Sequence, residues 1–419
     1  MSPDLSNQPK KLNKTRLILL SAALLTGAAL LVGPARARAN TPTPTPNVPN
    51  TPDLPLPQAQ FQPPAPPQPV AEPERPRIEV VFVVDTTGSM GGLIEGAKQK
   101  IWSIASEIAR GQPTPILEVG LVAYRDVGDA YVTKKFALTR DLDAMFVNLQ
   151  KLRADGGGDT PEHVGRALGE AVSKMAWSQD SKTMKLIYLV GDAPPHDDYK
   201  DGWNSTVWAR RAAEQGITVH AIRCGDDSDT SRSFTRIASI GSGNFISIGQ
   251  SGGMVATASP YDAELKRLNA EIAAKTMYGG AREARAATHA KVTTMAAMPA
   301  AASADRASFF GKGIGAGLAS TAAPAAEAGA VDLTSAPTKA AAMRDEELPT
   351  ELQGLNKAEQ QQKLVEMQKE RSGLEQQAAS VARQRADWLE KNSKDKDDAF
   401  DTKVKDSLKK QAADYGIKY

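Results

Sequence analysis

The sequence predicts an α/β protein, with a doubly wound, mostly parallel sheet covered by helices on both faces and a C-terminal α-helical segment after it. Between about residues 78 and 249, short apolar runs alternate with amphipathic ones, the order expected of strands and helices in turn. The first run, IEVVFVVD at 78–85, is nearly all apolar and β-branched. Such a run is typical of a strand buried on both faces.

The other elements of this domain, residues 77–250, follow from the spacing of apolar residues. After the first strand, apolar residues recur at helical spacing from Ile94 to Ile108. Strands are predicted over 116–124, 130–138, 186–190, 217–224 and 244–248, and helices over 142–152, 162–176 and 206–215. Cys224, the only cysteine, ends a predicted strand and is interpreted as a buried, inert thiol. A single cysteine excludes an intramolecular disulfide and a multi-cysteine zinc site.

A helical extension is predicted over 251–292. Ser259 is a suitable helix cap, Pro260 suits the first turn, and the apolar face runs from Leu265 to Ile272. The following residues, 293–345, are rich in alanine and are interpreted as a mobile linker, with some helix as the alternative.

The last segment, 346–419, is charged and rich in glutamine. One heptad row is apolar: Met367, Leu374, Val381 and Trp388. The other seam row is mixed: Leu364, Arg371, Ala378 and Arg385. Because a sustained coiled coil needs both rows apolar, a helical hairpin or a docking helix is as consistent with this pattern as an oligomeric coiled coil.

The first residues are typical of an export signal. Basic residues precede the apolar run 17–32, and Ala37-Arg38-Ala39 fits a signal peptidase site, so residues 1–39 are predicted to be a signal peptide. Residues 41–76 hold 14 prolines, which predicts an extended linker over 40–76. We therefore expect a secreted or periplasmic protein; the alternative is an uncleaved anchor in the inner membrane, with the folded part outside the cytoplasm.

The charge balance argues against nucleic acid as a partner. The chain has 51 Lys and Arg against 49 Asp and Glu, a net charge of +2. Nucleic-acid-binding domains usually carry a strongly basic patch or stripe.

The motif that carries chemistry is Asp85-Thr86-Thr87-Gly88-Ser89, at the end of the first predicted strand. The carboxyl edge of a parallel sheet is where open α/β folds bind ligands. One carboxylate and two hydroxyls suit a hard cation such as Mg²⁺, which prefers oxygen donors and keeps several waters. A solvated Asx/Ser turn is the alternative interpretation.

Two further segments are expected to converge on that turn. Asp192 follows the predicted strand 186–190, so it emerges at the same edge as Asp85 if both strands are central and parallel. The glycine-rich loop 155–162 allows close backbone approach, and either Asp159 or Thr160 is expected to reach the ion.

Together these segments resemble the metal-ion-dependent adhesion site (MIDAS) of von Willebrand factor type A (vWA) domains. The resemblance covers roughly residues 77–250. It implies that Asp85, Thr87, Ser89, Thr160 and Asp192 hold Mg²⁺, with Mn²⁺ or Ca²⁺ as alternatives. It also implies that a carboxylate of a protein partner completes the metal's coordination.

The sequence departs from the common family pattern at its second aspartate. Many members have Thr-Asp-Gly there, whereas this chain reads GDAPPH over 191–196. With the GGGDTPE segment at 156–162, this resembles a bacterial and protist branch that is sometimes fused to kinase domains. No kinase signature is present in the sequence.

Nearby side chains are given structural roles. Asp126 is interpreted as an ion-pair or loop residue and His196 as incidental to the site, although contact with the ligand is its alternative. Trp203 and Trp208 are expected to serve packing.

Three functions remain open from the sequence. The first is an extracytoplasmic binding or adhesion protein that uses the metal to hold an acidic group of a partner. The second is a scaffold with a vestigial metal site, acting or oligomerising through its C-terminal helices. The third is a metal-assisted hydrolase, which we do not expect because no nucleophile elbow, HExxH or phosphate-binding loop is found. A membrane partner is expected only if the N-terminal segment stays uncleaved.

Overall fold

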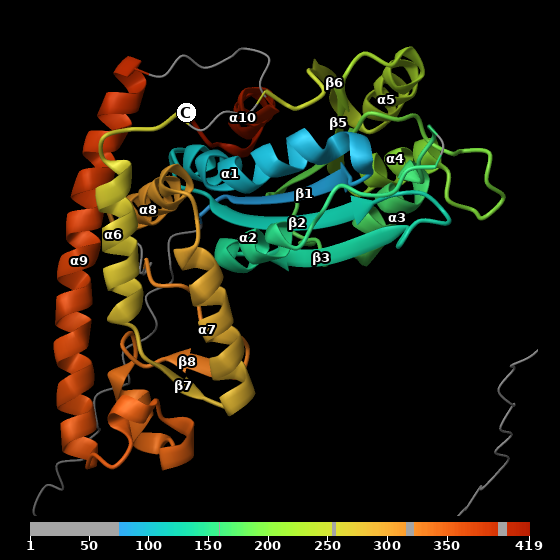
Figure 1. Cartoon of the computed structure of the whole chain (residues 1–419). Coiled ribbons are helices and arrows are strands. Elements are labelled where there is room, and N and C mark those ends of the chain that lie inside the picture. Colours follow the sequence, from blue (N-terminus) through green and yellow to red (C-terminus); the bar gives the residue numbers. More distant parts are fainter. Residues whose placement is uncertain (1–74, 159, 254–256, 316–321, 393–399) are drawn as a thin grey trace, which may run out of the picture. The chain divides into compact units, whose positions relative to one another are not determined.

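Six strands form one sheet in the order β3-β2-β1-β4-β5-β6, with β3 antiparallel and the other strands parallel (Figure 1). They span Arg77–Asp85 (β1), Ile116–Tyr124 (β2), Thr133–Thr139 (β3), Met184–Gly191 (β4), Ile217–Cys224 (β5) and Ser242–Ile248 (β6). The computed structural model describes residues 75–419, except 159, 254–256, 316–321 and 393–399. The predicted fold class is confirmed.

The central strand β1 is buried on both faces, as its sequence predicts. Val80 belongs to a core cluster on one face, and Val81 and Val83 belong to a second cluster on the other. Successive side chains of a strand point to opposite faces, so an unbroken apolar run supplies both cores at once.

Helices cover both faces of the sheet. The first cluster includes residues of α1 (Gly91–Ile108), α2 (Leu142–Gln150) and α10 (Phe400–Ala412). The second includes residues of α3 (Val164–Lys174), α4 (Ser205–Glu214) and α5 (Ser228–Ile240). Helix α5 is absent from the sequence-based prediction, although Asp227 caps it by accepting from the amide of Thr230 and Phe234 and Ile237 form its apolar face.

A helical region, residues 262–392, follows the sheet. It contains α6 (Asp262–Ala274), α7 (Arg282–Ala296), α8 (Ala300–Gly315), α9 (Lys357–Asn392) and the small strand pair β7 (Tyr278–Gly280) and β8 (Ala330–Asp332). Ser259 lies just before α6, where its amide and hydroxyl both donate to the Asp262 carboxylate.

Residues 293–345, interpreted as a mobile linker with some helix as the alternative, include a packed helix among their described residues. Helix α8 lies in this segment, and its Ala304 and Ala307 are buried against α6 and α9. Small side chains let helices approach closely, so the alanines that suggest a linker are here the contact surface of a packed helix.

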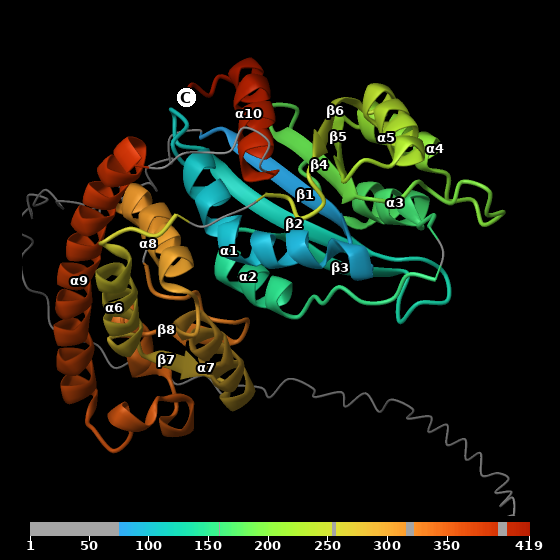
Figure 2. The same cartoon turned by 45° about the horizontal axis from the view of Figure 1, so that its top comes forward.

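Helix α9 docks along α6 and α8 within the same chain (Figures 1 and 2). Its buried row is Leu364, Arg371, Ala378 and Arg385, the row that appeared mixed in the sequence. The arginines are satisfied by carboxylates: Arg371 donates to Asp332 (2.8 Å), and Arg385 donates to Asp262 (2.6 Å) and Asp305 (2.7 Å). A docking helix, one of the three alternatives, therefore describes α9 in this structure.

Ion pairs also join the helical region to the sheet domain. Arg306 of α8 donates through two nitrogens to the two carboxylate oxygens of Asp143 in α2, at 2.7 and 2.6 Å. Lys291 of α7 donates to Asp141, the cap of α2, at 2.7 Å. Arg306, Asp143 and Lys291 are all almost fully buried.

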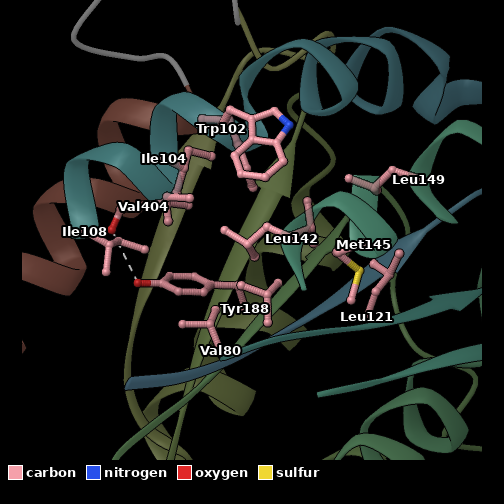
Figure 3. Packing of buried hydrophobic residues seen from close by; sticks show 14 of the residues in the cluster. Val80, Trp102, Ile104, Ile108, Leu121, Leu142, Met145, Leu149, Tyr188 and Val404 are labelled. Atoms are coloured by element: carbon pink, nitrogen blue, oxygen red, sulfur yellow. Dashed lines mark hydrogen bonds between the residues drawn. The ribbon is translucent and has the colours of Figure 1, made fainter. Parts of the chain in front are cut away.

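Helix α10 returns from the helical region to cover the sheet beside α1 (Figure 2). Phe400, Val404 and Leu408 pack into the first core cluster. The hydroxyl of Tyr188 on β4 donates to the Val404 carbonyl (3.3 Å; Figure 3). It also bonds to the Ser407 hydroxyl (2.7 Å). The end of the chain thus completes the core that β1 begins.

The predicted signal peptide and nearly all of the predicted proline-rich linker fall in residues 1–74, outside the described residues. Among the residues described, no helix is both long and apolar enough to cross a membrane.

Candidate metal centre

The predicted metal ligands lie where the strand order changes direction. The chain runs from β1 to β2 on one side and reaches β4 on the other, so the carboxyl end of β1 is a switch point of the sheet. Asp85 is the last residue of β1, and Asp192 directly follows β4, its parallel neighbour. The two strands are central and parallel, as the sequence argument required.

The Asp85 carboxylate is buried, and one of its oxygens has no protein donor. Oδ1 accepts from the Thr87 amide (2.8 Å) and from the Thr87 hydroxyl (2.7 Å). Oδ2 is buried and has no hydrogen-bond partner among the described residues. Burying a carboxylate oxygen without a hydrogen-bond partner raises the free energy of the folded protein. Such an oxygen is therefore expected to bind a cation or to have another function.

Burial raises the pKa of Asp85 to about 7, although the hydrogen bonds from Thr87 act in the opposite direction. The nearby Asp192 carboxylate adds to this rise by repulsion. Two carboxylates that disfavour each other's charge are stabilised by a cation between them.

The two hydroxyls of the motif differ in surroundings. Thr87 is buried beside Asp85, whereas Ser89 is exposed. The intervening Thr86 is excluded from the site, because its hydroxyl bonds to the Tyr124 carbonyl (2.9 Å) and the Tyr131 hydroxyl (2.7 Å). The hydroxyl of Thr87 thus belongs to the site, whereas the hydroxyl of the neighbouring Thr86 has a structural role.

The glycine-rich loop lies over Thr87. The Gly88 amide donates to the Gly156 carbonyl (3.3 Å), and a side chain on Gly157, whose φ is +91°, would contact Thr87. Thr160 is exposed, and no hydrogen bond of its side chain is found within the described ranges. Asp159 lies outside the described residues, so the choice between Asp159 and Thr160 stays a prediction.

Gln250 is a site residue that the sequence analysis missed. Its side-chain amide donates to Asp192 Oδ2 (2.6 Å) and to the Ser89 carbonyl (3.3 Å), linking the two motif segments. The available signal is its position two residues after β6, at the same carboxyl edge as Asp85 and Asp192.

Gly191 allows the two aspartates to approach. A Cβ at this position would lie 2.4 Å from the Tyr124 hydroxyl oxygen and 3.4 Å from Asp85 Cβ. The Tyr124 hydroxyl in turn donates to the Val190 carbonyl (3.3 Å). The first residue of GDAPPH is therefore glycine because the carboxyl ends of β1, β2 and β4 meet there.

The two motif loops are also paired through their backbones. The Glu162 amide donates to the Pro194 carbonyl (2.9 Å), and the His196 amide donates to the Glu162 carbonyl (2.8 Å). The His196 ring stacks on Tyr199, with centroids 4.4 Å apart, and bonds to Asp198. Asp126 accepts from the Tyr199 hydroxyl (2.6 Å) and lies 3.9 Å from His196.

Trp203 and Trp208 pack between helices. Their rings stack with centroids 5.3 Å apart, and Gly169 of α3 provides space for both. Cys224 is buried, and burial raises the pKa of its thiol well above the ordinary range. These features match the packing role expected for the tryptophans and the inert thiol expected for Cys224.

The donor set fits a hard cation better than a zinc-type site. Within the described part of the chain, no group of three or more His, Cys, Asp or Glu side chains is placed to hold a metal ion. The oxygens that the structure brings together here are those of the Asp85 and Asp192 carboxylates and the Thr87 hydroxyl. Such a small donor set leaves coordination positions for water and a ligand. A cation bound here would satisfy the unpartnered Asp85 oxygen.

Residues 79–255 match the family model of the von Willebrand factor A domain. Human von Willebrand factor A domain-containing protein 7 is 33% identical over 124 residues, which are 30% of this chain and 13% of that protein. An ariadne-like RING finger protein of Acanthamoeba polyphaga mimivirus is 29% identical over 28% of this chain and 11% of that protein. The chain thus spans under a fifth of the length of these relatives.

One solved structure to which the chain is similar is that of proximal thread matrix protein 1 from the mussel byssus with a zinc-occupied MIDAS motif. It is 15% identical, with a TM-score of 0.31, over 41% of this chain and 42% of that one. Domains of the von Willebrand factor A family generally mediate protein binding and commonly hold a divalent metal at a MIDAS. The family match over residues 79–255 and the sheet observed there support a von Willebrand factor A domain within this chain.

Proposed function

We propose that this protein is an extracytoplasmic binding protein that holds Mg²⁺ at the carboxyl edge of the sheet and captures an acidic group of a protein partner. Asp85, Thr87, Ser89, Thr160 and Asp192 would hold the ion. The observation that carries the proposal is the buried Asp85 oxygen without a protein donor. When bound, the ion supplies a positive charge with open coordination positions for a partner's carboxylate.

The chain's own residues prepare that edge. Thr87 fixes one oxygen of Asp85 and leaves the other available. Gln250 orients Asp192, and its bond to the Ser89 carbonyl holds the serine loop beside it. Such supporting contacts commonly change metal affinity by about 10–100-fold when removed. We propose no catalytic role for these residues.

A matched pair of threonine variants tests the metal site. Thr87→Val removes the hydroxyl beside Asp85, whereas Thr86→Val removes the hydroxyl turned toward Tyr131. Calorimetric titration with Mg²⁺ and Mn²⁺ is expected to show binding to wild type and T86V, and an affinity at least about tenfold lower in T87V. Equal affinities in all three proteins would contradict the assignment of Thr87.

Partner capture tests the function itself. The chain without residues 1–39 would serve as bait for envelope and extracellular proteins, in Mg²⁺, in chelator, and in Mg²⁺ with Asp85→Ala. We expect a partner that is retained only by wild type in Mg²⁺ and lost when its own acidic residue is substituted. A partner retained under all three conditions would instead favour a scaffold that acts through another surface.

The extracytoplasmic location rests on the N-terminal sequence and has its own test. Fusion of residues 1–76 to a phosphatase that is active only outside the cytoplasm should give an active reporter in a bacterial host. N-terminal sequencing of the mature protein is expected to begin at Asn40, and a protein that begins before the apolar run would support the anchored alternative.

A further inference from the structure

A second polar site lies away from the carboxyl edge, where the helical region meets the sheet domain. A cleft of about 630 Å³ is lined by side chains of α1, α8, α9 and α10. Helix α8 lies between α9 and α1 at this junction (Figures 1 and 2). Ligand sites are commonly clefts of about 300–1,000 Å³ at such junctions.

One wall of this cleft gathers three cations around a single carboxylate. Glu107 accepts from Lys409 Nζ at 2.6 Å and lies 3.2 Å from an Arg110 nitrogen. Lys312 is close enough to act on the same carboxylate. Burial disfavours the charge on Glu107, but Lys409, Arg110 and Lys312 outweigh it and hold its pKa below the ordinary value.

Lys312 has neutral hydrogen-bond partners only. Its ammonium donates to the Ser106 carbonyl (2.6 Å) and the Ser106 hydroxyl (2.7 Å). No carboxylate lies within ion-pair distance of it in the parts of the chain that are described. Burial, with some repulsion from Arg110, lowers the pKa of Lys312 to about 8.

Part of this charge has a structural use. Ser106 lies in the last turn of α1, where free carbonyls and the helix dipole favour a cation. The Lys312 ammonium occupies this position at the helix end, and Glu107 neutralises a second of the three cations. The remaining cation leaves this wall of the cleft positively charged. Asp305, another acidic residue that lines the cleft, is already paired with Arg385 at 2.7 Å. Asp387, Glu390 and Asp406 also line the cleft, from α9 and α10.

We propose that Arg110, Lys312 and Lys409 form a binding site for a dianionic phosphate group in this cleft. A guanidinium and two ammonium groups match the oxygens of a phosphate, and charge-assisted hydrogen bonds of this kind are strong. The site is separate from the proposed metal centre and does not depend on it. Both free phosphate and a phosphate monoester share the required chemistry.

The test is calorimetric titration of the whole protein, in buffer free of divalent cations, with inorganic phosphate, glycerol 3-phosphate and acetate. Wild type is expected to bind one or both phosphates saturably and acetate much more weakly. The tighter of the two phosphates identifies the source, either the free ion or a small phosphorylated molecule.

Three variants are expected to change the phosphate affinity in different ways. Lys312→Gln should weaken phosphate binding about tenfold or more, because one charge-assisted bond is lost. Glu107→Gln should strengthen binding, because the competing carboxylate is gone. Lys410→Gln, which removes an exposed cation next to Lys409, should leave binding unchanged. Circular dichroism checks that each variant is folded, and Lys312→Arg should retain binding if Lys312→Gln does not fold.

The proposal is overturned if wild type shows no saturable phosphate binding up to about 20 mM, a range in which even weak sites with free energies near −4 kcal/mol are detected. It is also overturned if the Glu107 and Lys312 substitutions change the affinity in the same direction.

Discussion

The Asp85 carboxylate at the carboxyl edge of the sheet and three buried arginines of the helical region differ in how their charge is paired. In the helical region, the buried Arg306, Arg371 and Arg385 each donate to carboxylates. At the carboxyl edge, Asp85 is equally buried, yet one of its oxygens has no donor among the described residues. Only the second arrangement leaves a charge that a ligand is needed to satisfy.

This difference separates structural charge from functional charge. A buried ion pair adds little net stability but is costly to break, because the remaining partner is left unpaired. A buried carboxylate with an unpaired oxygen destabilises the free protein and becomes favourable when a cation binds. Among the described residues, Asp126 and Asp129 also bury a carboxylate oxygen without a hydrogen-bond partner, so a missing partner indicates a metal site only together with the position of the motif.

The largest expected effect is on the paired charges. Asp143→Ala leaves the Arg306 guanidinium buried without its carboxylate. We expect the free energy of unfolding in urea to fall by about 3–5 kcal/mol. The control is Glu346→Ala, which removes a partner of Arg344 in an exposed pair and should cause no measurable change. Similar losses of unfolding free energy in both variants would contradict the difference proposed between buried and exposed ion pairs.

Substitution of Asp85 is expected to have the opposite effect and to stabilise the metal-free protein. Its pKa is about 7 in the folded protein against an ordinary 3.8, so between these values the folded state holds a proton that the unfolded chain has released. The stability of the metal-free protein should therefore fall as the pH rises from about 4 to 7. Asp85→Asn should remove this fall and stabilise the metal-free protein at pH 8 by roughly 1–4 kcal/mol.

Thermal unfolding with and without Mg²⁺ completes that test. Mg²⁺ should raise the unfolding temperature of wild type and have no effect on Asp85→Asn, because only the first binds the ion. Asp226→Asn, at an exposed carboxylate on the same edge, should behave as wild type. If Mg²⁺ also raised the unfolding temperature of Asp85→Asn, the metal site would have to lie elsewhere.

A smaller effect is expected from crowding the carboxyl edge. Gly191→Ala places a Cβ 2.4 Å from the Tyr124 hydroxyl oxygen, which should cost about 1–3 kcal/mol and weaken metal binding. Adding Tyr124→Phe removes the clashing oxygen, so the double variant should recover most of the loss. A double-mutant cycle measures the coupling, and purely additive effects would show that the strain arises elsewhere.

The smallest effect concerns the docking of α10. His220 is buried against Tyr188, with ring centroids 5.0 Å apart, and its Nε2 meets Gln411 of α10. Burial lowers its pKa, although the bond to Gln411 acts in the opposite direction. The unfolded chain then binds a proton more readily, so stability should be lost slightly as the pH falls below about 6.5.

Urea unfolding at pH 7.5 and pH 5.5 measures this loss. His220→Gln should reduce the difference between the two values, whereas a substitution of the exposed His289 should not. An unchanged difference in the His220 variant would assign the pH dependence to another group.

Much of the sheet domain could be predicted from sequence, because its signals are local. A strand buried on both faces needs an apolar run, and a residue placed just after such a run must lie at the sheet's edge. Asp85 and Asp192 were brought together by this argument alone. Helix α5 was missed although its cap and apolar face were present, and the only signal for Gln250 is its position just after β6, which does not indicate its bond to Asp192.

The sequence alone thus determined the strands of the sheet, most of its helices and the meeting of Asp85 with Asp192, because backbone periodicity and parallel strand direction impose them. The tertiary structure decided what the alanine-rich and charged segments do. Arg371 and Arg385 became a buried row only because Asp332, Asp262 and Asp305 lie opposite them, on segments distant in sequence. A charged side chain is buried or exposed according to its partner, and no local pattern records where that partner lies.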